Sequence, residues 1–147
     1  MQNVKTIEML LNDELLATET YQKALEELKF PGGQFLSNSL MPIWGDHKAA
    51  ANSLKEQMVK LGGTLSKSTG TWASWPKLVV EDADLRGKQS AVKALLDGER
   101  HCVVSYEAAL KTSDMSPEMR SLIEKTLLPT QQTHIRSLDR VLEATPA

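Results

Sequence analysis

The sequence predicts an all-α protein, a single four-helix bundle over residues 1–147 with a long crossover between its second and third helices. Four long segments carry apolar residues at steps of three and four, which is the spacing of one helix face. No segment of any length alternates apolar and polar residues in the way of a half-buried strand. The link between the second and third segments is long, whereas the other two links are short. A chain of 147 residues is also long enough to bury a core of its own.

The first half of the chain predicts two helices. The first runs from about Val4 to Leu28 and stops before the break FPGG, residues 30–33. The second runs from about Phe35 to Leu61, and Gly62 with Gly63 ends it as a C-cap pair. Because proline lacks an N–H group and clashes with the preceding turn, Pro42 predicts a kink or a later start for this helix.

The second half predicts two more helices. The stretch TLSKSTGTWASWPKL, residues 64–78, is rich in Ser, Thr and Gly and predicts the crossover, and KLVVEDADL after Pro76, residues 77–85, predicts a short helical piece. The third helix is expected from about Lys88 to Lys111. The fourth begins at SPEM, where Ser116 can cap and Pro117 suits the first helical position, and Pro129 predicts a bend in it.

Composition limits the classes of partner. The chain has 17 basic and 19 acidic residues and no block of like charges, so it lacks the footprint of a nucleic-acid or anionic-membrane binder. No apolar stretch approaches the roughly 20 residues of a membrane helix, and we expect no signal peptide. The one cysteine, Cys102, rules out an intrachain disulfide, and we expect a cytoplasmic protein. A homo-oligomer stays open, and the sequence identifies no protein partner.

Each predicted helix has a line of apolar residues on one face, here called its seam, and a polar residue interrupts each seam at a similar height. These residues are Glu14, His47, Glu99 and His134. A buried carboxylate without a partner is costly, so the two glutamates need partners. A metal-free network can supply them, from the imidazoles, Gln131 and the hydroxyls of Tyr21 and Tyr106. If both glutamates are buried, the pKa of at least one should rise, unless a cation or a charged histidine compensates.

The chain also contains an internal similarity. NDELLATETYQKAL (residues 12–25) and DGERHCVVSYEAAL (residues 97–110) align without a gap, so that Glu14 matches Glu99 and Tyr21 matches Tyr106. The second and fourth helices match more loosely around HKAAANSL and QQTHIRSL. The sequence therefore indicates a repeated helix pair.

These segments together resemble the ferritin-like superfamily, and within it a bacterial ferritin-like four-helix-bundle family of unknown function. The resemblance covers Val4 to Leu142 and depends on the order and spacing of several motifs. They are NDELLATETYQKALEEL, LKEQMVKLGG, TGTWASW, LLDGERHCVVSYEAAL and HIRSLDRVLE. It implies the fold of the superfamily, whose di-metal members take one Glu from each of two helices and a Glu-x-x-His from each of the other two.

The resemblance implies a reduced form of that metal site. Glu14 and Glu99 match the single glutamates, but the two Glu-x-x-His pairs become His47-x-x-Ala50 and Gln131-x-x-His134. Losing two carboxylates removes the charge that balances two metal ions, which argues against a di-iron oxidoreductase and against an enzyme. One divalent ion, Zn, Mn or Fe(II), remains compatible with the ligand set Glu14, His47, Glu99, His134 and Gln131. Three hypotheses stay open: a bundle with one metal ion, a metal-free structural or partner-binding bundle, and a di-iron oxidoreductase.

Overall fold

The computed structural model describes residues 2–27, 34–63, 88–112 and 114–144, and every regular element in these ranges is helical. The helices are α1 (Gln2–Glu27), α2 (Gln34–Lys60), α4 (Lys88–Leu110), α5 (Pro117–Leu122) and α6 (Leu128–Ala144), and a π-helical turn, η1 (Ile123–Leu127), joins α5 to α6. The all-α prediction is confirmed for these ranges. The predicted crossover loop and the short helical piece after it lie outside them.

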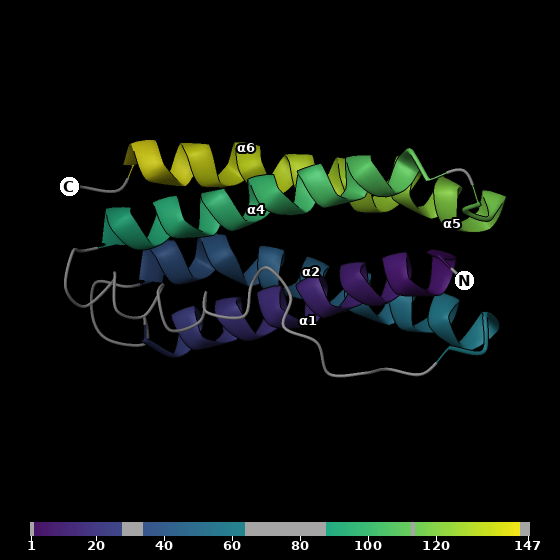
Figure 1. The fold of residues 1–147 in the computed structure, drawn as a ribbon. Helices are drawn as coiled ribbons and strands as arrows, with labels where there is room; N and C mark the ends of the chain where they lie inside the picture. The colour runs from purple at the N-terminus through teal and green to yellow at the C-terminus, as the bar shows by residue number, and fades with distance from the viewer. Residues whose placement is uncertain (1, 28–33, 64–87, 113, 145–147) are drawn as a thin grey trace.

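The bundle consists of two helix hairpins. α1 packs mainly against α2, and α4 packs mainly against α6, so the hairpins form two layers (Figure 1). α2 ends at the opposite end of the bundle from the start of α4, so these two helices run in the same direction (Figure 1). None of the described helices is both long and apolar enough to span a membrane.

The end of the first hairpin follows the sequence prediction. Gly62 has φ +72, which favours glycine, and Gly63 N–H donates to Met58 O at 2.9 Å, so the two glycines close α2. The alternative of a later helix start at Pro42 is wrong, because α2 begins at Gln34 and continues through this proline. Pro42 is the ninth residue of α2, so the helix lacks the hydrogen bond that the N–H of this residue would donate to the carbonyl of Asn38.

The last helix begins as predicted but contains an irregular turn. Ser116 caps α5, its Oγ accepting the Met119 N–H at 3.1 Å, and Pro117 occupies the first turn. The π-helical turn η1 directly precedes Pro129, and Leu128 N–H reaches back to Ile123 O. Pro129 has no N–H, so it cannot donate the usual α-helical hydrogen bond. The irregular turn therefore lies next to the proline at which the sequence predicted a bend.

The core divides into two apolar clusters with a polar layer between them. One cluster includes Tyr21, Leu40 and Leu95, and the other includes Leu11, Leu54 and Tyr106. Most apolar residues at helical spacing are buried, whereas Leu61, at the predicted end of the second helix, is 39% exposed. The buried polar residues of the central layer are Glu14, His47, Glu99, Gln131 and His134.

Candidate metal centre

The centre of the polar layer is the His47 side chain, which lies between two buried carboxylates. His47 Nδ1 is 2.5 Å from Glu14 Oε2, and His47 Nε2 is 2.8 Å from Glu99 Oε1. Helix α1 supplies Glu14, α2 supplies His47 and α4 supplies Glu99, so the imidazole connects one hairpin to the other. Both short contacts fit a doubly protonated imidazolium that donates to each carboxylate.

The two tyrosines complete this arrangement in a crossed pattern. The Tyr21 hydroxyl of α1 donates to Glu99 Oε1 at 2.8 Å, and the Tyr106 hydroxyl of α4 donates to Glu14 Oε1 at 2.5 Å. Each tyrosine therefore binds the glutamate of the opposite hairpin. Burial, followed by the neighbouring glutamate, raises the pKa of each phenol well above 10.0, so both remain hydrogen-bond donors.

The electrostatics follow from this pairing. Burial opposes a charged imidazole, but the carboxylates of Glu99 and Glu14 outweigh burial and raise the pKa of His47 well above 6.5. Burial likewise acts against an ionised Glu99. The positive charge of His47, followed by the contacts of His134 and His47 with the carboxylate, lowers the pKa of Glu99 from 4.5 to about 2. The sequence analysis allowed for a charged histidine that offsets the charge of the two buried glutamates, and this histidine is His47.

His134 and Gln131 reach the same layer from α6. His134 Nε2 lies 2.9 Å from Asp46 Oδ2, and His134 Nδ1 lies 3.4 Å from Glu99 Oε1, where it makes no hydrogen bond. Gln131 Nε2 donates to the backbone oxygen of Glu99 at 3.4 Å. The rings of His47 and His134 face one another with centroids 5.0 Å apart.

Two atoms of this layer have no hydrogen-bond partner within the described part of the chain. They are Glu99 Oε2 and His134 Nδ1, and both are buried. His47, Glu99 and His134 each offer a ligand atom, and these atoms lie within 4.8 Å of one another. The three side chains are therefore close enough to hold a metal ion, and Glu14 stands outside this group. Both oxygens of Glu14 are already engaged, by Tyr106 and His47.

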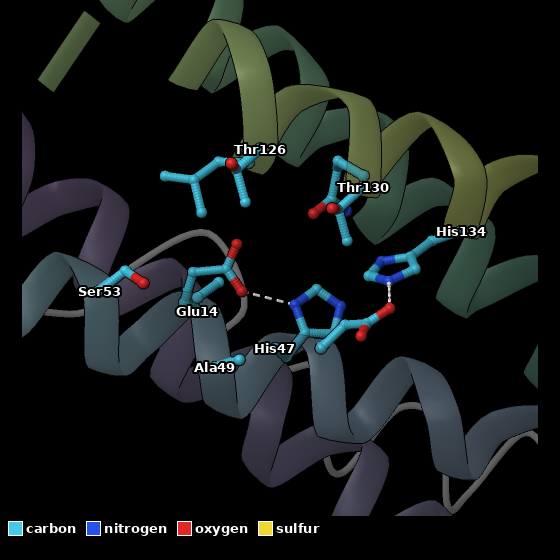
Figure 2. A pocket seen from close by; sticks show the side chains of 11 residues that line it. Glu14, His47, Ala49, Ser53, Thr126, Thr130 and His134 are labelled. Atoms are coloured by element: carbon cyan, nitrogen blue, oxygen red, sulfur yellow. Dashed lines mark hydrogen bonds and ion pairs between the residues drawn. The ribbon is translucent and has the colours of Figure 1, made fainter. Parts of the chain in front are cut away.

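A cleft of about 160 Å³ leads to this layer between α2 and the η1–α6 segment. Glu14, His47, Ala50, Gln131 and His134 are among the residues that line it. Ala49 and Ser53 of α2 lie across the cleft from Thr126 and Thr130 (Figure 2). Ala50, which stands where the resemblance has a metal-ligating histidine, lines this cleft. Among the residues that the structure describes, no lysine or arginine lines the cleft.

Asp46 is the residue of this site that the sequence reasoning missed. Its side chain is 51% exposed at the rim of the cleft, yet it holds the buried His134. Asp46 directly precedes His47, so an acidic residue next to a seam histidine was the available signal. The helix turns by about 100° between neighbours, which is why a search confined to the seam passes over it.

No protein-family model, curated protein or solved structure matches this chain. The ferritin-like resemblance therefore depends on the sequence motifs alone, and the residues of the polar layer are the basis for any statement about function.

Proposed function

We propose that this bundle binds one divalent metal ion between its two hairpins, through His47, Glu99 and His134. One observation carries the proposal: Glu99 Oε2 and His134 Nδ1, on two side chains of the cluster, are both buried and have no hydrogen-bond partner among the described residues. A buried polar atom left without a partner costs about 1–3 kcal/mol. A cation bound by both lone pairs would remove that penalty.

The spacing of the donors fits a small ion. His47 Nε2 and His134 Nδ1 lie 2.8 Å and 3.4 Å from Glu99 Oε1. Ligand atoms around a tetrahedral ion with bonds of about 2.0–2.2 Å lie about 3.3 Å apart, so only small side-chain shifts are needed. Two imidazoles and one carboxylate suit Zn, Mn or Fe(II).

The charge of the layer also favours a divalent cation. Three carboxylates contact the two imidazoles of the layer, Glu14 and Glu99 at His47 and Asp46 at His134, so acidic groups outnumber the histidines there. His47 can ligate only after its Nε2 proton leaves to solvent, so binding of the ion releases one proton.

Such an ion would be reachable from solvent. His47 and His134 line the cleft as well as the ligand cluster, whereas Glu99 lies behind them on α4. Three protein ligands leave coordination positions for water, and an ion bound in this way supplies Lewis acidity. This proposal fits a ferritin-like protein that has kept a reduced metal site, with a binding or stress-related role.

The second candidate is a metal-free bundle in which the polar layer only holds the hairpins together. It is favoured by His47, which already satisfies one oxygen of each glutamate. A fully paired buried network can specify how helices pack. This second candidate does not explain why Glu99 Oε2 and His134 Nδ1 are buried without a hydrogen-bond partner among the described residues.

Metal content separates the candidates. The full chain, purified without a nickel column, is analysed for bound elements and then titrated with Zn²⁺, Mn²⁺ and Fe²⁺. We expect one ion per chain, and loss of that ion in Glu99→Gln but not in the exposed control Glu118→Gln. No bound ion at any concentration tested would support the metal-free bundle. Two ions together with rapid oxygen consumption on adding Fe²⁺ would support the di-iron oxidoreductase.

A further inference from the structure

The two histidines of the cluster present different ring nitrogens to it. His47 turns Nε2 toward Glu99 and Nδ1 toward Glu14. His134 turns Nδ1 toward Glu99 and Nε2 toward Asp46. In each case, the nitrogen directed away from Glu99 meets a carboxylate oxygen, at 2.5 Å for Glu14 and 2.9 Å for Asp46.

We infer that Glu14 and Asp46 are positioning residues rather than metal ligands, and that they fix opposite tautomers on the two ligating histidines. Glu14 holds the proton of His47 on Nδ1, so this ring binds the ion through Nε2. Asp46 holds the proton of His134 on Nε2, so this ring binds through Nδ1. The inference rests on the proposed metal binding and adds the ligand atoms and the outer carboxylates.

The engagement of Glu14 is the first argument. Its two oxygens accept from Tyr106 and from His47 at 2.5 Å each, so a metal ion would have to displace one of these donors. Glu99 differs, because its Oε2 has no donor among the described residues. Of the two glutamates that the internal similarity makes equivalent, Glu99 is thus the one with an oxygen that accepts no hydrogen bond from the described residues.

The position of Asp46 is the second argument. Its side chain is half exposed at the rim, whereas the His134 side chain is only 4% exposed. An aspartate at the rim can hold the outer nitrogen of the ring and leave the inner nitrogen facing Glu99. Metal-ligating histidines usually donate their other N–H to such a carboxylate, and removing it typically lowers metal affinity 10- to 100-fold.

The test compares ion number with affinity. Purified full-length variants are titrated with Zn²⁺ by calorimetry. We expect Glu14→Gln to bind one ion about 10- to 100-fold more weakly, because the glutamine oxygen can still accept from His47. Asp46→Leu should show a similar loss, Asp46→Asn a smaller one, and the exposed control Asp97→Asn none. Glu99→Gln should bind no ion.

Long-range ¹H–¹⁵N NMR spectra of the zinc-loaded protein show which ring nitrogen of each histidine carries the proton. A purely structural role of Glu14 and Asp46 would not determine this result. We expect the ring proton on Nδ1 of His47 and on Nε2 of His134. The opposite tautomer on either ring would overturn the inference. So would loss of the ion in Glu14→Gln with folding intact, since Glu14 would then be a ligand while the proposed metal binding stands.

The two proposals fail in different ways. If wild type binds no zinc, the proposed function is wrong and this inference falls with it. If wild type binds one ion but affinity is unchanged in both Asp46→Leu and Glu14→Gln, only this inference is wrong. Should Glu14→Gln fail to fold by circular dichroism, the Asp46 series and the spectra of wild type decide the question alone.

Discussion

Replacing His47 by leucine tests the central pairing of the metal-free protein. The change removes the one cation between Glu14 and Glu99 and leaves two buried carboxylates that repel each other. A hydrogen bond to a charged group contributes about 1.5–3 kcal/mol, so the two bonds of His47 together contribute about 3–6 kcal/mol. Leucine recovers part of this through apolar burial. We expect a loss of about 3–5 kcal/mol at pH 7, the range for a broken buried pair.

The loss should also depend on pH. Without the imidazolium, burial and like charge raise the pKa of one of the two carboxylates in the variant. A group whose pKa is raised on folding regains stability as the pH falls, so His47→Leu should be less destabilising at pH 5 than at pH 7. The assay is urea unfolding followed by circular dichroism in the presence of a chelator.

His101→Leu is the matched control, since His101 is an exposed histidine on α4 and should change stability little. The reasoning would be refuted by a loss for His47→Leu below about 1 kcal/mol, the ordinary effect of a point mutation. A loss of equal size at pH 5 and pH 7 would refute the electrostatic part.

Three further predictions concern the same layer. Wild type without metal should be most stable between about pH 4.5 and 6.5. The stabilisation from His47 is fully present below pH 6.5 and is lost as the pH rises toward the raised pKa of His47 in the folded protein. The stabilisation from Glu99 is fully present above pH 4.5 and is lost as the pH falls toward the folded pKa of about 2. A flat unfolding profile across pH 4 to 8 would contradict this. Tyr21→Phe and Tyr106→Phe should each destabilise the protein by about 1–3 kcal/mol in urea unfolding, because each leaves a buried carboxylate oxygen without that donor. A triple variant that combines His47→Glu, Ala50→His and Gln131→Glu restores the ligands that the ferritin-like resemblance implies. If that resemblance holds, ferrous titration should find two ions in this variant and faster oxidation of Fe(II) than in wild type. Two tightly bound ions in wild type would contradict the proposal.

The helices and the polar layer were predictable for different reasons. Helical periodicity, the Gly62–Gly63 end of α2 and the Ser116 cap are local signals, and each fixes a boundary within a few residues. The four polar seam residues lie at a similar height on their helices, so they meet if the helices are aligned in the bundle. The sequence therefore predicted the neighbourhood of Glu14, His47, Glu99 and His134.

The division of roles within that neighbourhood was not predictable. Glu14 and Glu99 occupy equivalent positions in the two similar segments, and nothing local distinguishes them. Their difference arises from α2 and α6, because His47 contacts both glutamates while His134 approaches only Glu99. The role of Asp46 likewise depends on a distant part of the chain, since the ring that it contacts is 88 positions later.

The pairing of the two hairpins has a consequence for how the chain assembles. Because α1 contacts mainly α2, and α4 mainly α6, each hairpin can form early from contacts close in sequence. Its glutamate stays hydrated until the hairpins dock, and docking then removes water from both carboxylates at once. The crossed bonds of Tyr21, Tyr106 and His47 are satisfied in only one relative register of the hairpins. A slip by one helical turn would bury Glu99 without Tyr21 and His47, and Glu14 without Tyr106, so the polar layer penalises misdocked chains that apolar packing alone would tolerate.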